Sequence, residues 1–135
     1  MSGVAIVREL LANNSHVVSI TSAARVVAGI LPQGAYLPAL SVHQVGETEE
    51  PTLARNMPNK MIRERVQVTA LAKDWAVMKR LLKAADLGPG VKTGFVKGFK
   101  VCSILPEGVG PEIPPGDSEI YEQSRDFVVT FLEPN

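Results

Sequence analysis

Histidine and cysteine, which carry much of nucleophilic and metal chemistry in proteins, are few in this chain, and their spacing does not suit such chemistry. His16 and His43 are the only histidines and Cys102 is the only cysteine, so no HxxxH or CxxC metal-binding spacing exists. A cysteine nucleophile would need one of these histidines beside it. Cys102 instead alternates with Lys100 and Ile104 in a predicted strand, which favours a structural thiol. The sequence therefore predicts no metal site and no catalytic cysteine.

Three glutamates, Glu47, Glu49 and Glu50, lie close together in the sequence. They could form a general-acid pair or hold a cation, but they lie beside Pro51 with no apolar neighbours to shift their pKa values. A solvated loop is the favoured interpretation. The glycines at 108–110 do not form a nucleotide loop, because no predicted helix follows them to hold a phosphate. We therefore expect no cofactor and no enzymatic activity.

Lys92, Lys97 and Lys100 form a local cluster of one charge sign, interleaved with Phe95 and Phe99. These lysines are candidates to face DNA or a neighbouring subunit, and a solvated strand end is the alternative. The whole chain has 14 Lys and Arg against 14 Asp and Glu, a formal net charge of zero. This balance argues against binding nucleic acid through bulk positive charge, and it makes self-association easier.

The composition is that of an ordinary globular domain. The chain has 135 residues, 45% of them hydrophobic and 21% charged, enough to bury a core without a disulfide or a metal. No apolar run approaches the ~20 residues of a membrane-spanning helix, and the first 15 residues do not follow the pattern of a secretory signal. We expect one domain over residues 1–135 and no contact with a membrane.

Hydrophobic periodicity predicts the elements of the first half. A helix begins at Ser2 and ends at Asn13–Asn14. Residues 16–37 are ambiguous, with a short strand as one possibility at 25–31, and a strand is predicted over 37–45. The next strand has one apolar face, formed by Ile62, Val66, Val68 and Ala70. Residues 63–65 are expected to form cross-strand pairs on the opposite, open face of the sheet.

The second half predicts a helix followed by two strands. Asp74 is a plausible N-cap, and Trp75 and Met78 are expected in the core, with an interface role as the alternative. Strands are predicted over 95–105 and 119–132. The predicted fold is therefore α+β, with an antiparallel or mixed sheet of four to five strands and two helices packed on one face.

Two long loops are predicted at hairpin ends, over residues 46–60 and 106–118. Connections of this length are uncommon in a compact domain unless they are functional or disordered. The loops are therefore the expected places of contact with partners. Their charged residues are the candidates for that contact: Glu47, Glu49, Glu50, Arg55, Lys60, Glu107, Glu112 and Asp117.

Several segments, taken in order, resemble one known family. They are the N-terminal helix, residues 25–40 (RVVAGILPQGAYLPAL), residues 65–70 (RVQVTA), the helix from Asp74, and residues 125–131 (RDFVVTF). In this order they resemble the phage tail completion proteins, also called tail terminators or tail-to-head joining proteins. The resemblance covers nearly the whole chain by pattern and order and includes no catalytic motif.

The resemblance implies a small α+β structural protein of the virion tail of a phage or prophage, assembled in the cytoplasm of the bacterial host. Proteins of this family form a ring, typically of six copies, at the head-proximal end of the tail tube. The ring ends tube polymerisation and offers a surface to the head connector. The implied partners are other copies of the chain, the tail-tube protein and head connector proteins, and DNA passes through the ring without sequence-specific binding.

A small ligand-binding or regulatory α+β domain is the alternative function. Such a domain needs polar groups that converge on a pocket, whereas an assembly protein needs surfaces for self-association and shows no turnover. An enzyme would present a titrating side chain in a cleft, and no acid–base pair is evident in the sequence.

Overall fold

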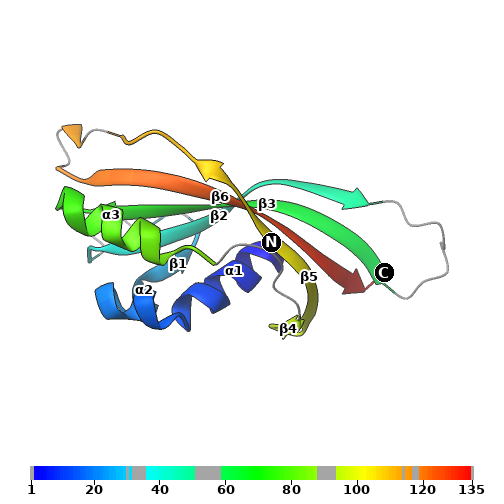
Figure 1. The fold of residues 1–135 in the computed structure, drawn as a ribbon. Helices are drawn as coiled ribbons and strands as arrows, with labels where there is room; N and C mark the ends of the chain where they lie inside the picture. The colour runs from blue at the N-terminus through cyan, green and yellow to red at the C-terminus, as the bar shows by residue number, and fades with distance from the viewer. Residues whose placement is uncertain are drawn as a thin grey trace.

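The described residues form a mixed sheet of six strands with helices packed on one of its faces (Figure 1). The computed structural model describes residues 2–29, 31, 36–50, 59–87, 94–113, 115–116 and 119–134. The strands are β1 (Val26–Ala28), β2 (Ala39–Glu50), β3 (Asn59–Ala72), β4 (Gly94–Val96), β5 (Phe99–Val109) and β6 (Tyr121–Pro134). Their order is β1-β2-β3-β6-β5-β4; β1 is parallel to β2 and the other pairs are antiparallel.

The predicted α+β class is confirmed, but the prediction of four to five strands was too low. The short strand considered at 25–31 exists as β1, Val26–Ala28. The strand predicted over 95–105 is two strands joined by a tight turn at Lys97 and Gly98, whose φ angles are 53° and 83°. Two consecutive residues with positive φ suit the right-handed twist of a two-residue hairpin. Lysine is not a typical residue for this turn, so the sequence signal was weak.

Three α-helices lie in the described part of the chain, one more than predicted. They are α1 (Ser2–Ala12), α2 (Ser15–Ile20) and α3 (Trp75–Ala84), with a short 3-10 helix at Ala23–Arg25. The additional helix is α2. The Asn14 side chain caps it by accepting hydrogen bonds from the backbone N–H groups of His16 (2.9 Å) and Val17 (3.3 Å). Asparagine therefore separates two helices where the sequence predicted only a helix end.

The helices cover one face of the sheet, called the covered face below, and leave the opposite, open face without a helix in the described residues (Figure 1). Helix α1 packs on β1, β2 and β3, and α3 packs on β3 and β6. The predicted alternation of β3 is confirmed, because Val66 and Val68 are fully buried while Arg63 and Arg65 are exposed. Phe127 on β6 is also fully buried. The core therefore lies between the two central strands and the helices.

Glu64 lies on the covered face, which corrects its predicted place on the open face. Its side chain points to the same face of β3 as the side chains of Ile62 and Val66, and it is fully buried. Helix α1 passes directly over it, with Gly3 at the point of closest approach. The prediction placed all three charged residues at 63–65 on the open face because of their charge. The alternation of side chains along the strand instead determines which of them points inward. Only Arg63 and Arg65 of the three face the open side.

Both predicted long loops begin within strands, so their boundaries are corrected. Strand β2 continues to Glu50 and pairs with β3, which begins at Asn59. Strand β5 continues through Pro106 to Val109. Strand β2 has a bulge after Gln44, and β5 has a bulge after Pro106. Each bulge accommodates an extra residue without ending the strand pairing. The backbone ladder thus extends through polar and proline-containing segments that have little strand propensity of their own.

Replacing Val68 by aspartate should abolish cooperative folding. The side chain of Val68 is fully buried, and an unpaired carboxylate there costs several kcal/mol against a total stability of about 5–15 kcal/mol. Thermal unfolding followed by circular dichroism checks this prediction. Val45→Asp is the matched control, because Val45 lies in the same sheet but is 51% exposed. Equal melting temperatures for the two variants would show that the assigned register of β3 is wrong.

Replacing Gly3 by alanine should destabilise the protein by about 1–3 kcal/mol, because the added methyl group overpacks a full site. A Cβ at this position would lie 2.6 Å from the Cδ atom of Glu64. Urea unfolding measures the loss. Gly46→Ala is the control, since a Cβ at Gly46 has no atom within 4 Å and its backbone has no positive φ. Similar effects of both substitutions would contradict the close approach of α1 to β3.

Candidate functional site: the open face and the free edges of the sheet

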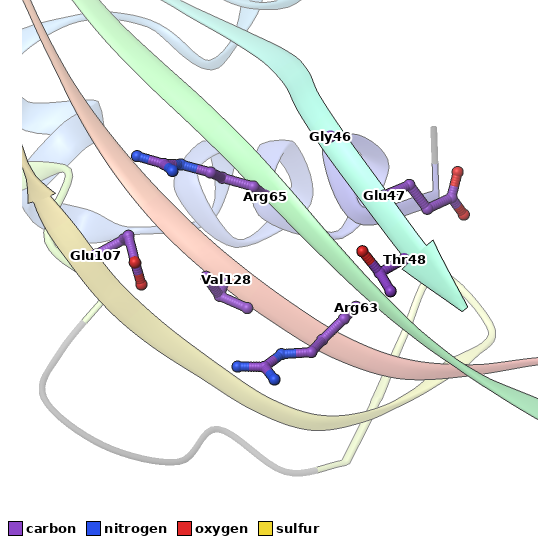
Figure 2. A pocket seen from close by; sticks show the side chains of 7 residues that line it. All are labelled: Gly46, Glu47, Thr48, Arg63, Arg65, Glu107 and Val128. Carbon is purple, nitrogen blue, oxygen red and sulfur yellow. The ribbon is translucent and has the colours of Figure 1, made fainter. Parts of the chain in front are cut away.

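The open face carries a shallow charged groove of about 520 Å³. Figure 2 shows that it crosses the four long strands, with Arg63 and Arg65 on β3 and Glu107 on β5. The lining residues are Gly46, Glu47, Thr48, Arg63, Arg65, Glu107 and Val128. No cysteine, histidine or serine is among them. The groove therefore offers charge and hydrogen-bonding groups for contact with another molecule.

An ion pair between Arg65 and Asp126 ties β3 to β6 on the open face. Arg65 donates from Nε at 2.9 Å and from Nη2 at 2.7 Å to the same oxygen, Oδ2 of Asp126. The arginine side chain is 49% exposed and the aspartate 15%, so the pair contributes at most about 1 kcal/mol to stability. The predicted cross-strand pairing on this face is thus present at Arg65. Its main effect is to fix the orientation of the guanidinium group.

Strands β2 and β5 each have a free edge in the described part of the chain. Strand β1 pairs only with residues 40–42 of β2, so the outer edge of β2 has no strand partner from His43 to Glu50. On the other side of the sheet, β4 pairs only with residues 99–101 of β5, so its outer edge has none from Cys102 to Val109. A free strand edge presents unpaired N–H and C=O groups to any chain that can align with it.

The acidic candidates of the first predicted loop lie on the β2–β3 hairpin. Glu47 and Glu49 are exposed on β2, and Glu50 is the last residue of that strand. Glu49 forms an ion pair of 3.8 Å with Lys60 on β3. Arg55 lies outside the described residues. This end of the sheet is therefore acidic, with one of its carboxylates partly balanced by Lys60.

Two residues of the predicted lysine cluster, Lys97 and Lys100, lie on the β4–β5 hairpin. Lys97 lies in the β4–β5 turn and forms an ion pair of 3.5 Å with Glu9 of α1. Lys100 is exposed on β5, and Lys92 lies outside the described residues. The ion pair of Lys97 holds the β4–β5 hairpin against α1, a structural role that the sequence did not indicate.

Glu112, a candidate contact residue from the second predicted loop, contacts side chains of α3. Its carboxylate forms an ion pair with Lys79. The Nζ atom of Lys79 also donates a hydrogen bond to Oε1 of Gln123 at 2.6 Å. The same atom lies 5.6 Å from the centre of the Trp75 ring. The hydrogen bond from Lys79, followed by one from Trp75, lowers the pKa of Glu112 below its usual value. Trp75 is 48% exposed, so its predicted place in the core is wrong, whereas the fully buried Met78 confirms its prediction.

The remaining candidates in the described residues lie on β5, α2 and β2. Glu107 faces the groove on the open side (Figure 2), and Asp117 lies outside the described residues. Cys102 is a free, half-buried thiol at a bulge of β5, His16 is on α2, and His43 is on β2. Among the described residues, no group of three or more His, Cys, Asp and Glu side chains is placed to hold a metal ion.

Within the described ranges, no helix has the length and apolar character that crossing a membrane requires.

Comparison with known proteins shows a similar fold and no match by sequence. No protein-family model matches the chain, and no curated protein matches it. Among solved structures, it is similar to a chain of the virion of a native gene transfer agent (GTA) particle, with a TM-score of 0.68. The alignment covers 96% of this chain and 94% of that chain, at 9% sequence identity. At this identity the likeness establishes a shared fold over nearly the full length of both chains.

The lowered pKa of Glu112 predicts an acid transition that the single tryptophan of the chain can report. The ion pair with Lys79 is intact above the ordinary carboxyl pKa and is lost as the pH falls through the lowered value. The emission of Trp75 should therefore change at a lower pH than an ordinary glutamate titrates. Glu112→Gln should lack this step, while far-UV circular dichroism stays constant over the same range. The same step in the glutamine variant would show that another group causes it.

Proposed function

We propose that this chain is a structural component of a phage-like particle, and more specifically a tail completion protein. In this proposal, copies form a ring at the head-proximal end of the tail tube, end its polymerisation and join tail to head. The observation that carries the proposal is the fold shared with a chain of a gene transfer agent virion over 96% of this chain. The sequence resemblance to tail completion proteins supports the more specific role.

The two ends of the sheet suit the two partners that such a ring must contact. The β2–β3 hairpin, with Glu47 and Glu49, lies at one end, and the β5–β6 connection, with Glu112, lies at the other (Figure 1). In the proposed assembly, one end contacts the last ring of tail-tube protein and the other contacts the head connector. Because the two ends differ in sequence and structure, each can be specific for its own partner.

The mechanism is steric and needs no cofactor. A head-to-tail contact between identical copies gives a ring if the rotation closes, and an open filament if it does not. A closed ring on the last layer of the tube removes the surface on which further tube subunits would add. DNA passes through the ring without sequence-specific contact, in keeping with a net charge of zero, and Lys97 and Lys100 are candidates to face DNA or a neighbouring subunit.

The alternative, a small ligand-binding or regulatory domain, would use the groove on the open face. Arg63 and Arg65 could hold an anionic ligand there. The groove is a shallow depression across the strands, whereas small-molecule sites typically enclose most of their ligand. We therefore favour contact with another macromolecule on this face.

Deleting the gene from the phage or prophage that encodes it should leave filled heads and unjoined tails, some of them abnormally long. Supplying the wild-type chain from a plasmid should restore joined particles, and the Val68→Asp variant should not. Electron microscopy of the lysates gives the readout, with tail lengths measured against the parent. Normal joined particles in the deletion strain would refute the proposed function, as would catalytic turnover by the purified chain that one side-chain substitution abolishes.

A further inference from the structure

We infer that neighbouring copies of this chain join through their free strand edges, by antiparallel pairing of Gly46–Thr48 of β2 in one copy with Ser103–Leu105 of β5 in the next. The inference deepens the proposed function, because it rests on side-by-side assembly and names the surfaces that make it. The occupant of each free edge is thus the opposite edge of a second copy.

The two free edges lie at the same height of the sheet. Thr48 of β2 lies opposite Arg63 of β3, and Arg63 lies opposite Thr130 of β6. Thr130 lies opposite Ser103 of β5, so Thr48 and Ser103 are at the same height. In the same way, Gly46 reaches Leu105 through Arg65 and Val128. If a second copy is related to the first by rotation about an axis parallel to the strands, the β2 edge of one copy lies at the same height as the β5 edge of the other.

The strand directions also fit. Strands β2, β3, β6 and β5 are each antiparallel to the next, so β2 and β5 run in opposite directions within one sheet. A ring keeps all copies in the same orientation about its axis. The β5 edge of one copy and the β2 edge of the next are therefore antiparallel, the arrangement in which short strand pairs form perpendicular hydrogen bonds.

Neighbouring features limit the pairing to about three residues on each strand. On β5, residues 99–101 are already paired with β4, and Pro106 has no backbone N–H to donate. The ion pair between Lys97 and Glu9 holds the β4–β5 hairpin against α1, on the covered side of the sheet. Between these limits lies the segment Ser103–Leu105. The sheet already uses pairs of this length, because β1 and β4 have three residues each.

The side chains of the two edges are complementary in shape. Leu105 is 40% exposed, and Gly46, at the same height, has no atom within 4 Å of an added Cβ. In the paired edges, the space over Gly46 of one copy accommodates Leu105 of the next on the open face.

Cysteine cross-linking tests this contact in particles assembled from the variant chain. The test pair is Thr48→Cys with Ser103→Cys, in a background in which Cys102 is replaced by serine. Within one copy these positions are three strand spacings apart, about 14 Å, and a disulfide needs Cα atoms closer than about 7 Å. Any disulfide between them is therefore intermolecular. The matched control, Thr48→Cys with Glu107→Cys, uses the same open face but lies about 13 Å out of register.

Mild oxidation of the test variant should give covalent oligomers larger than a dimer on non-reducing gels, with roughly tenfold more cross-linked chain than the control because only the test pair reaches disulfide distance. Gly46→Cys with Leu105→Cys is a second test pair at another level of the same contact. All four positions are at least partly exposed, and unchanged circular dichroism melts confirm folding. Equal cross-linking of test and control pairs would overturn the register.

The outcomes separate this inference from the proposed function. Joined tails of normal length without cross-links from either test pair would overturn the edge pairing and leave the tail role intact. Cross-linked oligomers of the purified chain, together with normal particles in the deletion strain, would uphold the edge pairing and refute the tail role. Cross-links confined to the control pair would show that copies associate in a different register, which also overturns the inference.

Discussion

The pairing of β3 with β6 is the constraint on which the rest of the structure depends. Each residue from Asn59 to Ala72 lies opposite a residue between Tyr121 and Pro134, without a bulge. These two strands supply the largest part of the buried face of the sheet, and both α1 and α3 pack on that face. Strands β2 and β5 then add on either side. Their own outer neighbours are only three residues long, so both sides of the sheet keep free edges.

The same constraint explains why a glutamate is buried. The alternation of β3 places Ile62, Val66 and Val68 on the covered face, and Glu64 has the same parity. A shift of one residue would turn Glu64 outward but would bring Arg63 and Arg65 under the helices, at a larger cost in desolvation. The burial of one carboxylate is therefore the smaller penalty. It also requires a residue without a side chain above it, which Gly3 of α1 provides.

Sequence reasoning succeeded where a segment's own residues determine its structure. Helix α3, with its Asp74 cap, and the apolar face of β3 follow from periodicity, and the structure confirms both. It failed where a neighbour determines the structure. The polar residues after Gly46 form a strand because β3 pairs with them. Trp75 is exposed on α3, where it contacts Lys79 of the same helix and Glu112 from the segment after β5.

The candidate site shows the same division. Charged residues such as Glu47 and Glu49 could be identified as exposed from the sequence, because they have no apolar neighbours. That Lys97 would pair with Glu9, and that the β2 and β5 edges would be free at the same height, could not be predicted. Which residues of β2 and β5 lie at the same height depends on the register of each strand pair between them. A bulge in any of these strands shifts that relation by one residue.

The asymmetry of the sheet has a consequence for the proposed assembly. Its two edges belong to different strands, so contact between them is head-to-tail and generates a ring or an open filament. Pairs of three residues contribute few hydrogen bonds each, which makes a single contact weak and favours a closed ring, in which every copy has both edges satisfied. Such a ring would have two different rims, one formed by the β2–β3 hairpins and the other by the β5–β6 connections. A structure that must contact a repeating tube on one side and a different partner on the other requires this difference, and the order of the strands is enough to produce it.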